Sequence, residues 1–470
     1  MKKFIVLLLA LTLLLASCGG GGGEEATTEW QSQEVNESAA YFLDTVEDKW
    51  DYETITLASI STNIRGGEEL TAESTLVDEG RFKQHLITEE HFDVDINWIE
   101  IPTSESVTEM RTQANLEDGA VAFIAGAMRM MTLATEGLLT NLNSISTLDL
   151  THEWWNQSMN ENMDLGGAIY VTAGPIAEWY YGAPFAMAFN KTIMTNYNIP
   201  DLYSTVHAGN WTLEEMEKIT TDYGLYQPND QGTGTFALSN NTSNMGYSWL
   251  VSCGVKLTEV SEDGEISVAH LGNEATRNAI EKIQNAMRMD EVNFQSIEPA
   301  FTVFKENRSL FWGSTTGYMS SHLPSCEVDY GIIPCPKLDS SQEEYLSAGW
   351  STSNFCLGVS SRVAGDELDW VGAFLDVYCF LGYEYVKPAK FDAIMKYQVA
   401  NDPIASEMMS IIFDNMIFDL NMCVDFGGTA SLMDKVCEGS LSLGMLSSMI
   451  KMSQNAVDKD LQAYKALLNK

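Results

Sequence analysis

The sequence predicts an α/β protein of two lobes, each built on a mostly parallel sheet flanked by helices. The chain has 470 residues, which is too long for one ordinary core, so two or three domain-sized bodies are expected. Strand-like and helix-like segments alternate in its first third, the pattern of a parallel sheet covered on both faces. An apolar, aromatic stretch over 180–189 contains Gly182 and Pro184, which interrupt regular strand pairing and suit a crossing between two bodies.

The N-terminus carries an export signal. Lys2 and Lys3 precede an apolar run over 4–16, which is the pattern of a secretory signal and is too short for a spanning helix. The junction L-A-S-C ending at Cys18 resembles a bacterial lipobox, in which the cysteine is acylated and becomes the mature N-terminus. We therefore expect residues 1–17 to be a lipoprotein signal peptide and Cys18 to carry the lipid.

Residues 18–51 are expected to be the lipidated cysteine and a flexible spacer, because a run of five glycines is followed by a polar segment. The formal charge of the chain is −40. A field of that sign repels phosphate backbones and anionic lipid head groups, so it argues against nucleic acid as a partner and against membrane contact other than through the lipid anchor.

Cysteine usage and motifs argue against metal and redox chemistry. Seven cysteines remain after Cys18, an odd number that cannot all pair, and Cys356 and Cys379 lie in apolar runs that fit buried free thiols. No C-x-x-C, G-x-S-x-G, Walker loop or H-E-x-x-H is present. We therefore expect no metal, no cofactor and no enzymatic activity, although a spatial pair of catalytic carboxylates stays open in a chain with 66 acidic residues.

The first lobe is predicted from alternating segments. Strands are expected over 53–60, 92–101 and 120–125, and helices over 76–90, 106–116 and 128–142. Ligands of parallel sheets sit beyond the carboxyl ends of the strands. The polar residues that follow the first and third strands are therefore candidate ligand-binding residues: Asn63, Arg65 and Arg129.

The stretch 178–216 continues the crossing with two helices. A short helix is expected over 190–197, and a second begins at a T-x-x-E capping box flanked by a hydrophobic staple. The capping box is Thr212 and Glu215, and the staple is Trp211 and Met216.

Three further segments share one family's pattern with this stretch. They are LFWGSTTGYM at 310–319, YGIIPCPKL at 330–338 and SQEEYLSAGWSTSNFCLGVSS at 341–361. Together with 178–216, they resemble the family 1 extracellular solute-binding lipoproteins of bacterial ABC importers, the group that includes maltose-binding protein. The likeness spans roughly residues 53–470, and it is most specific at 178–216 and 330–361. The resemblance implies the periplasmic-binding-protein type 2 fold, with several crossings between its two lobes.

On this basis, the chain crosses between lobes near 174–184, near 330 and near 382–388. Lobe 1 is expected to comprise 52–176 plus 331–384, and lobe 2 to comprise 177–330 plus 385–470. Neither lobe is then continuous in sequence.

The resemblance implies a receptor that captures a small neutral solute, an oligosaccharide, for an ABC transporter permease. The protein would be extracytoplasmic, lipid-anchored to the outer face of the membrane of a Gram-positive bacterium. Aromatic rings can stack on sugar faces, and the candidates near the crossings are Trp179, Tyr180, Tyr181, Trp312 and Trp350, with Asn354 beside them.

One departure weakens the assignment to sugar. The family's acidic P-D pair is replaced by D-G-A at 118–120, and A-G-A-M follows at 125–128, where sugar binders often present polar groups. The alternatives are a receptor for peptide or polyamine and, from a different class, a surface-anchored glycan hydrolase.

Overall fold

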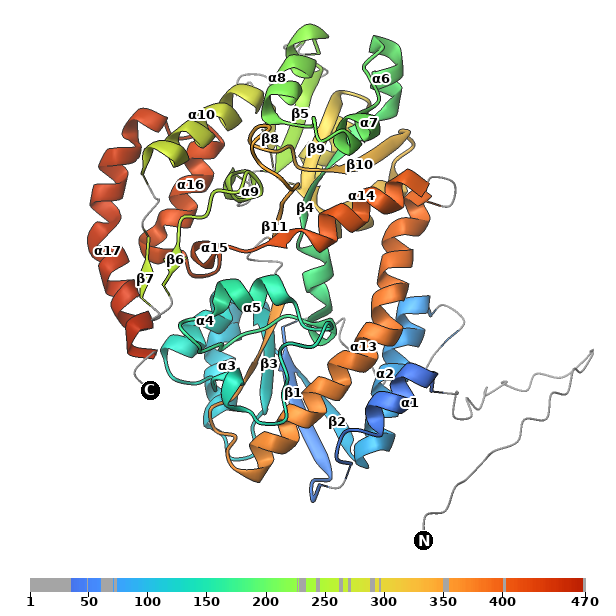
Figure 1. The fold of residues 1–470 in the computed structure, drawn as a ribbon, viewed down its shortest axis with the longest axis vertical. Coiled ribbons are helices and arrows are strands. Elements are labelled where there is room, and N and C mark those ends of the chain that lie inside the picture. The colour runs from blue at the N-terminus through green and yellow to red at the C-terminus, as the bar shows by residue number, and fades with distance from the viewer. Residues whose placement is uncertain are drawn as a thin grey trace, which may run out of the picture. The chain divides into compact units, whose positions relative to one another are not determined.

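The structure, a computed structural model, describes residues 35–48, 50–60, 71, 74–225, 227, 234–241, 246–261, 265–268, 272–287, 292–295, 297–349, 355–399 and 403–467. The expected signal peptide and Cys18 lie outside these residues. Asn36–Lys470 forms one compact unit, which is built around two sheets (Figure 1).

The first sheet has the strand order β12-β3-β1-β2. β1 pairs in parallel with β2 and β3, and β12 pairs antiparallel with β3. Its strands are β1 (Thr54–Ser59), β2 (Asp95–Glu100), β3 (Ala122–Gly126) and β12 (Phe355–Val359), and the helices between the first strands are α2 (Leu76–Phe92), α3 (Ser106–Asn115) and α4 (Ala127–Thr135). The predicted β-α-β-α-β-α order is confirmed, and α4 ends seven residues earlier than the predicted limit of 142.

The second sheet has the order β10-β4-β9-β5-β8. β5 is parallel to β8 and β9, whereas β4 is antiparallel to β9 and β10. Its strands are β4 (Phe185–Asn190), β5 (Phe236–Asn241), β8 (Val292–Gln295), β9 (Ser309–Thr315) and β10 (Tyr330–Pro334). Side chains alternate across β4: Phe185, Met187 and Phe189 enter one core cluster, and Ala186 and Ala188 enter the cluster on the opposite face.

The remaining elements are helices and two short strand pairs outside the two main sheets. The other helices are α1 (Glu37–Leu43), α5 (Gln157–Met163), α6 (Lys191–Tyr197), α7 (Leu202–His207), α8 (Leu213–Asp222), α9 (Gly246–Ser252), α10 (Glu274–Met287), α11 (Ile297–Lys305), α12 (Thr316–His322), α13 (Asp366–Val399), α14 (Pro403–Asp414), α15 (Leu420–Val424), α16 (Thr429–Cys437) and α17 (Leu446–Leu467). Two short ladders pair β11 (Ser347–Ala348) with β13 (Met416–Ile417) and β6 (Glu259–Val260) with β7 (Ile266–Ser267). The 3-10 helices are η2 (Thr103–Glu105), η3 (Leu142–Ser144), η4 (Pro175–Gly182), η6 (Leu323–Ser325), η7 (Phe426–Gly428) and η8 (Leu443–Met445).

Local sequence explains the helices after β4. Asn190 caps α6 by accepting from the Ile193 N–H at 3.0 Å, and Thr212 caps α8 by accepting from the Glu215 N–H at 3.3 Å. The two predicted staple residues, Trp211 and Met216, are fully buried in one core cluster. The starts of both helices are therefore encoded locally.

The first crossing is helical where an extended chain was expected. Residues 175–182 form η4, kinked at Ala177, and regular strand begins only at Phe185. The close approach of Gly182 to the chain after β9 explains its glycine, because a Cβ there would lie 3.0 Å from the Cα of Gly317. Gly182 thus ends η4, whereas Pro184 already forms a β-bridge with Gly349. The segment coils before it extends.

The second and third crossings also differ from the expected boundaries. Lobe 1 was expected to resume at residue 331, yet β10 pairs with β4 in the second sheet, and the strand that joins the first sheet is β12. The apolar run at 330–334 identifies a strand without saying which sheet it joins. At the third crossing, one helix, α13, continues through Pro388 and packs against both α2 and α14.

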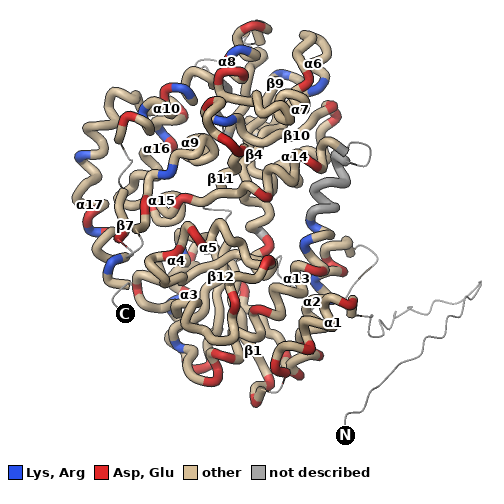
Figure 2. The backbone as a smooth tube through the Cα atoms, viewed as in Figure 1, with Lys and Arg blue, Asp and Glu red and all other residues tan. Residues whose placement is uncertain are grey.

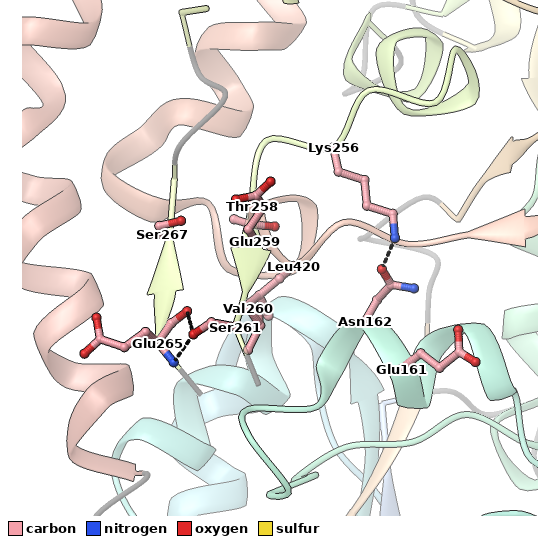
Figure 3. A pocket seen from close by; sticks show the side chains of 10 residues that line it. All are labelled: Glu161, Asn162, Lys256, Thr258, Glu259, Val260, Ser261, Glu265, Ser267 and Leu420. Atoms are coloured by element: carbon pink, nitrogen blue, oxygen red, sulfur yellow. Dashed lines mark hydrogen bonds between the residues drawn. The ribbon is translucent and has the colours of Figure 1, made fainter. Parts of the chain in front are cut away.

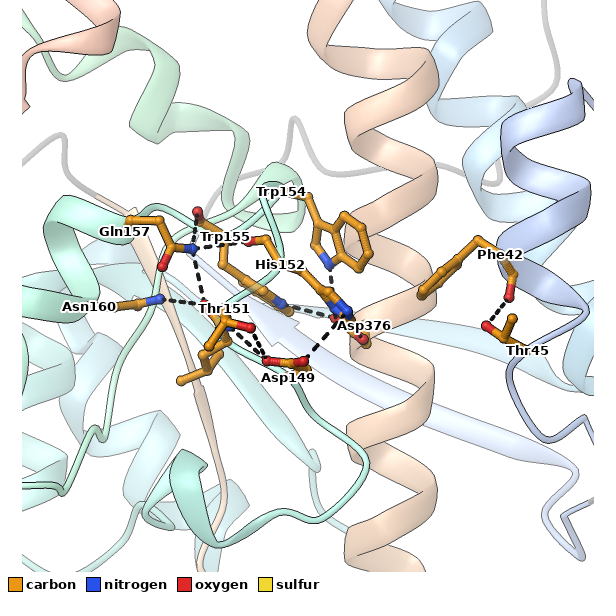
Figure 4. A network of polar contacts seen from close by, with 11 residues as sticks. Phe42, Thr45, Asp149, Thr151, His152, Trp154, Trp155, Gln157, Asn160 and Asp376 are labelled. Atoms are coloured by element: carbon orange, nitrogen blue, oxygen red, sulfur yellow. Dashed lines mark hydrogen bonds and ion pairs between the residues drawn. The ribbon is translucent and has the colours of Figure 1, made fainter.

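Residues 149–160 are tied to α13 by the carboxylate of Asp376 (Figure 4). Trp154 Nε1 and Trp155 Nε1 donate to Asp376 Oδ1 at 2.8 and 2.9 Å, and His152 Nδ1 lies 3.1 Å from Oδ2. Burial raises the pKa of Asp376, while these three partners oppose the rise. Phe42 of α1 packs on His152 and Trp154, so the network also seats the first helix.

Charge and thiol placement agree with the composition. Acidic positions are distributed over both lobes, without a single cluster (Figure 2). The seven cysteines of the described chain are free, and six of them are buried. None of the described helices is both long and apolar enough to cross a membrane.

Candidate functional site

A pocket of about 600 Å³ lies between segments packed on the two sheets (Figure 3). We call it the interlobe pocket, and its lining residues are Glu161, Asn162, Lys256, Thr258, Glu259, Val260, Ser261, Glu265, Ser267 and Leu420. One wall is α5, whose Met159 and Met163 are buried in the core cluster that contains Phe123 of β3. On the opposite side, Lys256 and Thr258 flank Leu257, which is buried in the cluster of the second sheet, whereas Val260 and Leu420 pack in the same cluster as α5. Groups from both sides therefore face one space.

The charged groups of the pocket are mostly carboxylates. It contains three glutamates and one lysine, and none of its lining residues is aromatic. Glu265 pairs with Lys465 at 2.9 Å, and its backbone N–H donates to Ser261 Oγ at 3.0 Å. Lys256 Nζ donates to Asn162 Oδ1. Carboxylates can accept from hydroxyls or ammonium groups, and the cavity falls within the roughly 300–1,000 Å³ of small-molecule sites.

A second, more open groove of about 800 Å³ lies on the surface of α7 and α8. Asp201, Glu214, Lys218 and Asp339 are among its lining residues. Each of these belongs to a segment that packs with the second sheet, because α7, α8 and residues 335–345 enter that core cluster. A ligand there would contact one lobe only, whereas a ligand in the interlobe pocket would contact both.

The carboxyl end of β9 packs directly against the first crossing. The backbone N–H of Thr316 donates to Pro184 O at 2.9 Å, and Thr316 Oγ1 donates to Tyr181 O at 3.1 Å. Next to this end, Asn240 of β5 is fully buried, and its amide atoms have no hydrogen-bond partner among the described residues. The carboxyl edge of the second sheet thus contains a buried amide without a partner among the described residues. The sequence analysis did not identify it, although a polar S-N-N run ends this strand.

The predicted aromatic residues of the crossing lie in the core. Tyr180 and Tyr181 are 8% and 3% exposed, and their ring centroids are 4.1 Å apart. Burial raises the pKa of both phenols. Neither lines the interlobe pocket, so in this conformation they support the crossing rather than offer a stacking face.

Trp312 occupies the middle of β9 and is fully buried. Its ring packs on Phe301 and Phe304, with centroids 5.0 and 6.2 Å away. It leaves no exposed face on which a sugar could stack, and in this conformation Trp312 is a core residue.

Of the other predicted binding residues, only Arg129 is described with its side chain. It is half-buried on α4, the helix that contacts α15, and it forms no ion pair with another described residue. The side chain of Trp179 and the predicted residues Asn63, Arg65, Trp350 and Asn354 lie outside the described part of the chain. Within that part, no group of three or more His, Cys, Asp or Glu residues could hold a metal ion.

The fold is similar to those of three solved solute-binding proteins. An ABC substrate-binding protein from Listeria monocytogenes in complex with cycloalternan is 13% identical, with a TM-score of 0.54 over 88% of this chain and 99% of that chain. The GacH receptor of Streptomyces glaucescens, solved unliganded and with acarbose, is 14% identical, with a TM-score of 0.51 over 89% and 99%. A family 1 extracellular solute-binding protein from Bifidobacterium longum subsp. infantis is 13% identical, with a TM-score of 0.54 over 88% and 99%.

At the level of sequence, no curated protein matches the chain. Residues 85–300 match the profile of the bacterial extracellular solute-binding proteins. This segment runs from α2 through the first crossing to α11, so it includes parts of both sheets. This part of the chain is therefore similar to the bacterial extracellular solute-binding proteins, and the chain shares the two-lobe fold of the solved examples.

Proposed function

We propose that this protein is a lipid-anchored extracytoplasmic receptor that binds an oligosaccharide in the interlobe pocket and delivers it to an ABC permease. The observation that carries the proposal is the pocket itself, which is lined from both sides of a two-lobe fold. The similar receptors from Listeria and Streptomyces were solved with cycloalternan and acarbose, and these carbohydrates support a sugar as the ligand class.

The chemistry of the pocket suits a hydroxyl-rich ligand and disfavours a strongly anionic one. Glutamate carboxylates accept from sugar hydroxyls, and an ammonium or an amide donates to them. A strongly anionic ligand would meet three carboxylates and one ammonium, which is unfavourable. Binding would close the lobes by hinge motion at the crossings, since contacts to both walls favour the closed form.

Anchoring and export rest on the sequence. The run at 4–16 and the L-A-S-C junction support removal of a signal peptide and acylation of Cys18. Acyl chains contribute about 0.8 kcal/mol per buried CH₂, which is enough in combination to retain the protein at the outer face of a Gram-positive cell membrane.

A thermal-shift screen tests the ligand class. The panel contains maltotriose, cellotriose, chitobiose, a tripeptide and spermidine, and a ligand at 100 times its Kd stabilises the folded protein by about 2.7 kcal/mol. We expect a sugar to raise the melting temperature. A shift with only the tripeptide or spermidine would refute the sugar assignment, and release of reducing ends from a glycan would indicate a hydrolase instead of a receptor.

Two glutamates make a matched test of the site. Glu161 lines the interlobe pocket on α5 and Glu214 lines the groove on α8, and the backbones of both are helical. With the sugar found in the screen, Glu161→Ala should weaken affinity about threefold or more, because a hydrogen bond to a charged group is lost. Glu214→Ala should leave affinity unchanged, and the reverse result would move the site to the groove.

A further inference from the structure

One hydrogen bond spans the interlobe pocket from wall to wall. Lys256 is half-buried, and its Nζ donates to Asn162 Oδ1 on α5 (Figure 3). Asn162 is oriented for this contact, because its Nδ2 donates to Ser158 O on the same helix at 2.6 Å and leaves Oδ1 free to accept from the pocket. The contact joins residues 94 positions apart in the chain.

The backbone beside Lys256 is held by a carboxylate that does not line the pocket. Asp419 is fully buried and caps α15. Its Oδ2 accepts from the Leu257 N–H and, at 2.9 Å, from Tyr247 Oη. Its Oδ1 accepts from Thr258 Oγ1 and, at 2.9 Å, from the Asn421 N–H.

These four donors come from three segments. Tyr247 belongs to α9, Leu257 and Thr258 to the chain that leads to β6, and Asn421 to α15. Among the described residues, no lysine, arginine or histidine forms an ion pair with Asp419. Burying a carboxylate without a cation is costly unless hydrogen-bond donors saturate it. The three segments that supply these donors are therefore held in position around Asp419.

Two of these segments are pocket walls. Thr258 lines the pocket next to Lys256, and Leu420, which follows Asp419 directly, lines it from α15. A small displacement at residues 257–258 would move the Lys256 stem and withdraw Nζ from Asn162. Asp419 therefore holds both the pocket wall and the contact between Lys256 and Asn162 in place.

We propose that Asp419 is a positioning residue of the interlobe pocket: it holds residues 257–258 so that Lys256 reaches Asn162 and links the two walls before any ligand binds. The inference rests on the proposed function only in taking this pocket as the ligand site. It adds a ligand-independent closing contact and the residue that sets it.

The reactivity of the Lys256 amine measures this contact directly. The full mature protein, without sugar, is treated with an acetyl N-hydroxysuccinimide ester, and acetylation is followed by mass spectrometry of the digest. Lys218, whose side chain is 63% exposed, is the reference in the same sample. Asn162→Ala removes the acceptor, so Lys256 should react about two- to tenfold faster, the factor expected for one hydrogen bond.

Asp419→Asn should accelerate Lys256 to a similar extent, because the carboxamide cannot accept from all four donors. Thr258→Val removes one donor at nearly constant volume and should give a smaller acceleration in the same direction. It also carries the test if Asp419→Asn does not fold. Asp376→Asn is the control, since Asp376 is another buried carboxylate saturated by N–H donors but lies on α13.

Unchanged Lys256 reactivity in folded Asp419→Asn or Thr258→Val would overturn the proposal. Equal acceleration in Asp376→Asn would also overturn it, because the effect would then be general loosening. No ligand is present in this experiment. Failure of sugar binding would therefore refute the proposed function without affecting the role of Asp419, and unchanged Lys256 reactivity would refute the role of Asp419 without affecting the proposed function.

Discussion

Removal of the Glu178 carboxylate should destabilise the protein strongly, because this residue joins the first crossing to the first lobe. Glu178 lies in η4 and is 5% exposed. Its two oxygens accept from Arg81 Nε and Nη2, each at 2.6 Å, and Oε2 also lies 3.0 Å from Lys390 Nζ. Glu178→Ala therefore leaves two cations without their main partner.

The structure indicates the size of the effect. Breaking a buried ion pair by removing one partner costs about 3–5 kcal/mol. Arg81 retains Asp78 at 3.1 Å, and the Lys390 side chain is 27% exposed. Both features reduce the cost of losing the carboxylate. We therefore expect the unfolding free energy to fall by about 3 kcal/mol, the lower end of this range.

Glu136→Ala is the matched control. Glu136 also accepts two hydrogen bonds from one arginine, Arg111 Nε and Nη2, at 2.6 and 2.5 Å. Its side chain is 33% exposed and that of Arg111 is 43% exposed, so solvent screens the pair and the loss should be far smaller. The two pairs share the same hydrogen-bond geometry, so the difference in unfolding free energy between the two variants measures the effect of burial.

Urea unfolding followed by circular dichroism measures both variants, provided that the slope m stays unchanged. The double variant Arg81→Met/Glu178→Leu removes the buried pair as a unit and should recover much of the loss. If Glu178→Ala cost no more than Glu136→Ala, the argument from burial would be refuted.

Four other predictions follow from the sequence and the structure. Cys18→Ser should release the mature protein into the medium, and unchanged membrane retention in cell fractionation would contradict the anchor. Trp312→Ala should lower the unfolding free energy by about 3–5 kcal/mol through a core cavity, measured by urea unfolding; a native stability with weakened sugar affinity would instead restore its role in stacking. Burial raises the pKa of Asp434 to about 7 and of Glu438 to about 8, so the folded state retains protons that the unfolded chain loses near pH 4, at about the ordinary carboxyl pKa. Stability should fall with rising pH by up to about 1.4 kcal/mol per pH unit for each group, from about pH 4 to about 7 for Asp434 and to about 8 for Glu438. The pH-dependent urea unfolding of Asp434→Asn should show a flatter profile, and an identical slope would count against the raised pKa of Asp434. A fragment ending at Pro324 lacks β12 of the first sheet and should melt without a cooperative transition, whereas a sharp transition in calorimetry would contradict the interleaved lobes.

Much of the fold follows from local sequence. β-branched and alternating runs identify β1, β2 and β3, and the residues around Thr212 determine where α8 begins. These signals act within a few residues, through strand periodicity and helix capping. The family pattern at 330–338 is also a property of consecutive residues, and it identified the fold.

Which neighbours cover a residue within its sheet is harder to predict from the sequence. The aromatic run at 310–312 identified β9, but the sequence does not say where along the strand the core ends. Trp312 lies three residues before the end of β9 at Thr315 and is enclosed by α11. A strand pattern reports alternation between faces and carries no information on which neighbours cover each face.

By itself, the sequence determined the order of strands and helices in the first lobe, the likeness to the solute-binding family, and the absence of a common catalytic or zinc motif, because each depends on residues close together in the chain. The tertiary structure alone decided which sheet β10 joins, that the crossing at 175–182 coils, and that the pocket walls meet at Lys256 and Asn162. The two residues are 94 positions apart, and Asp419 lies 161 from Thr258. Contacts over such separations depend on how the whole chain packs, and no periodicity or capping signal in a single sequence records them.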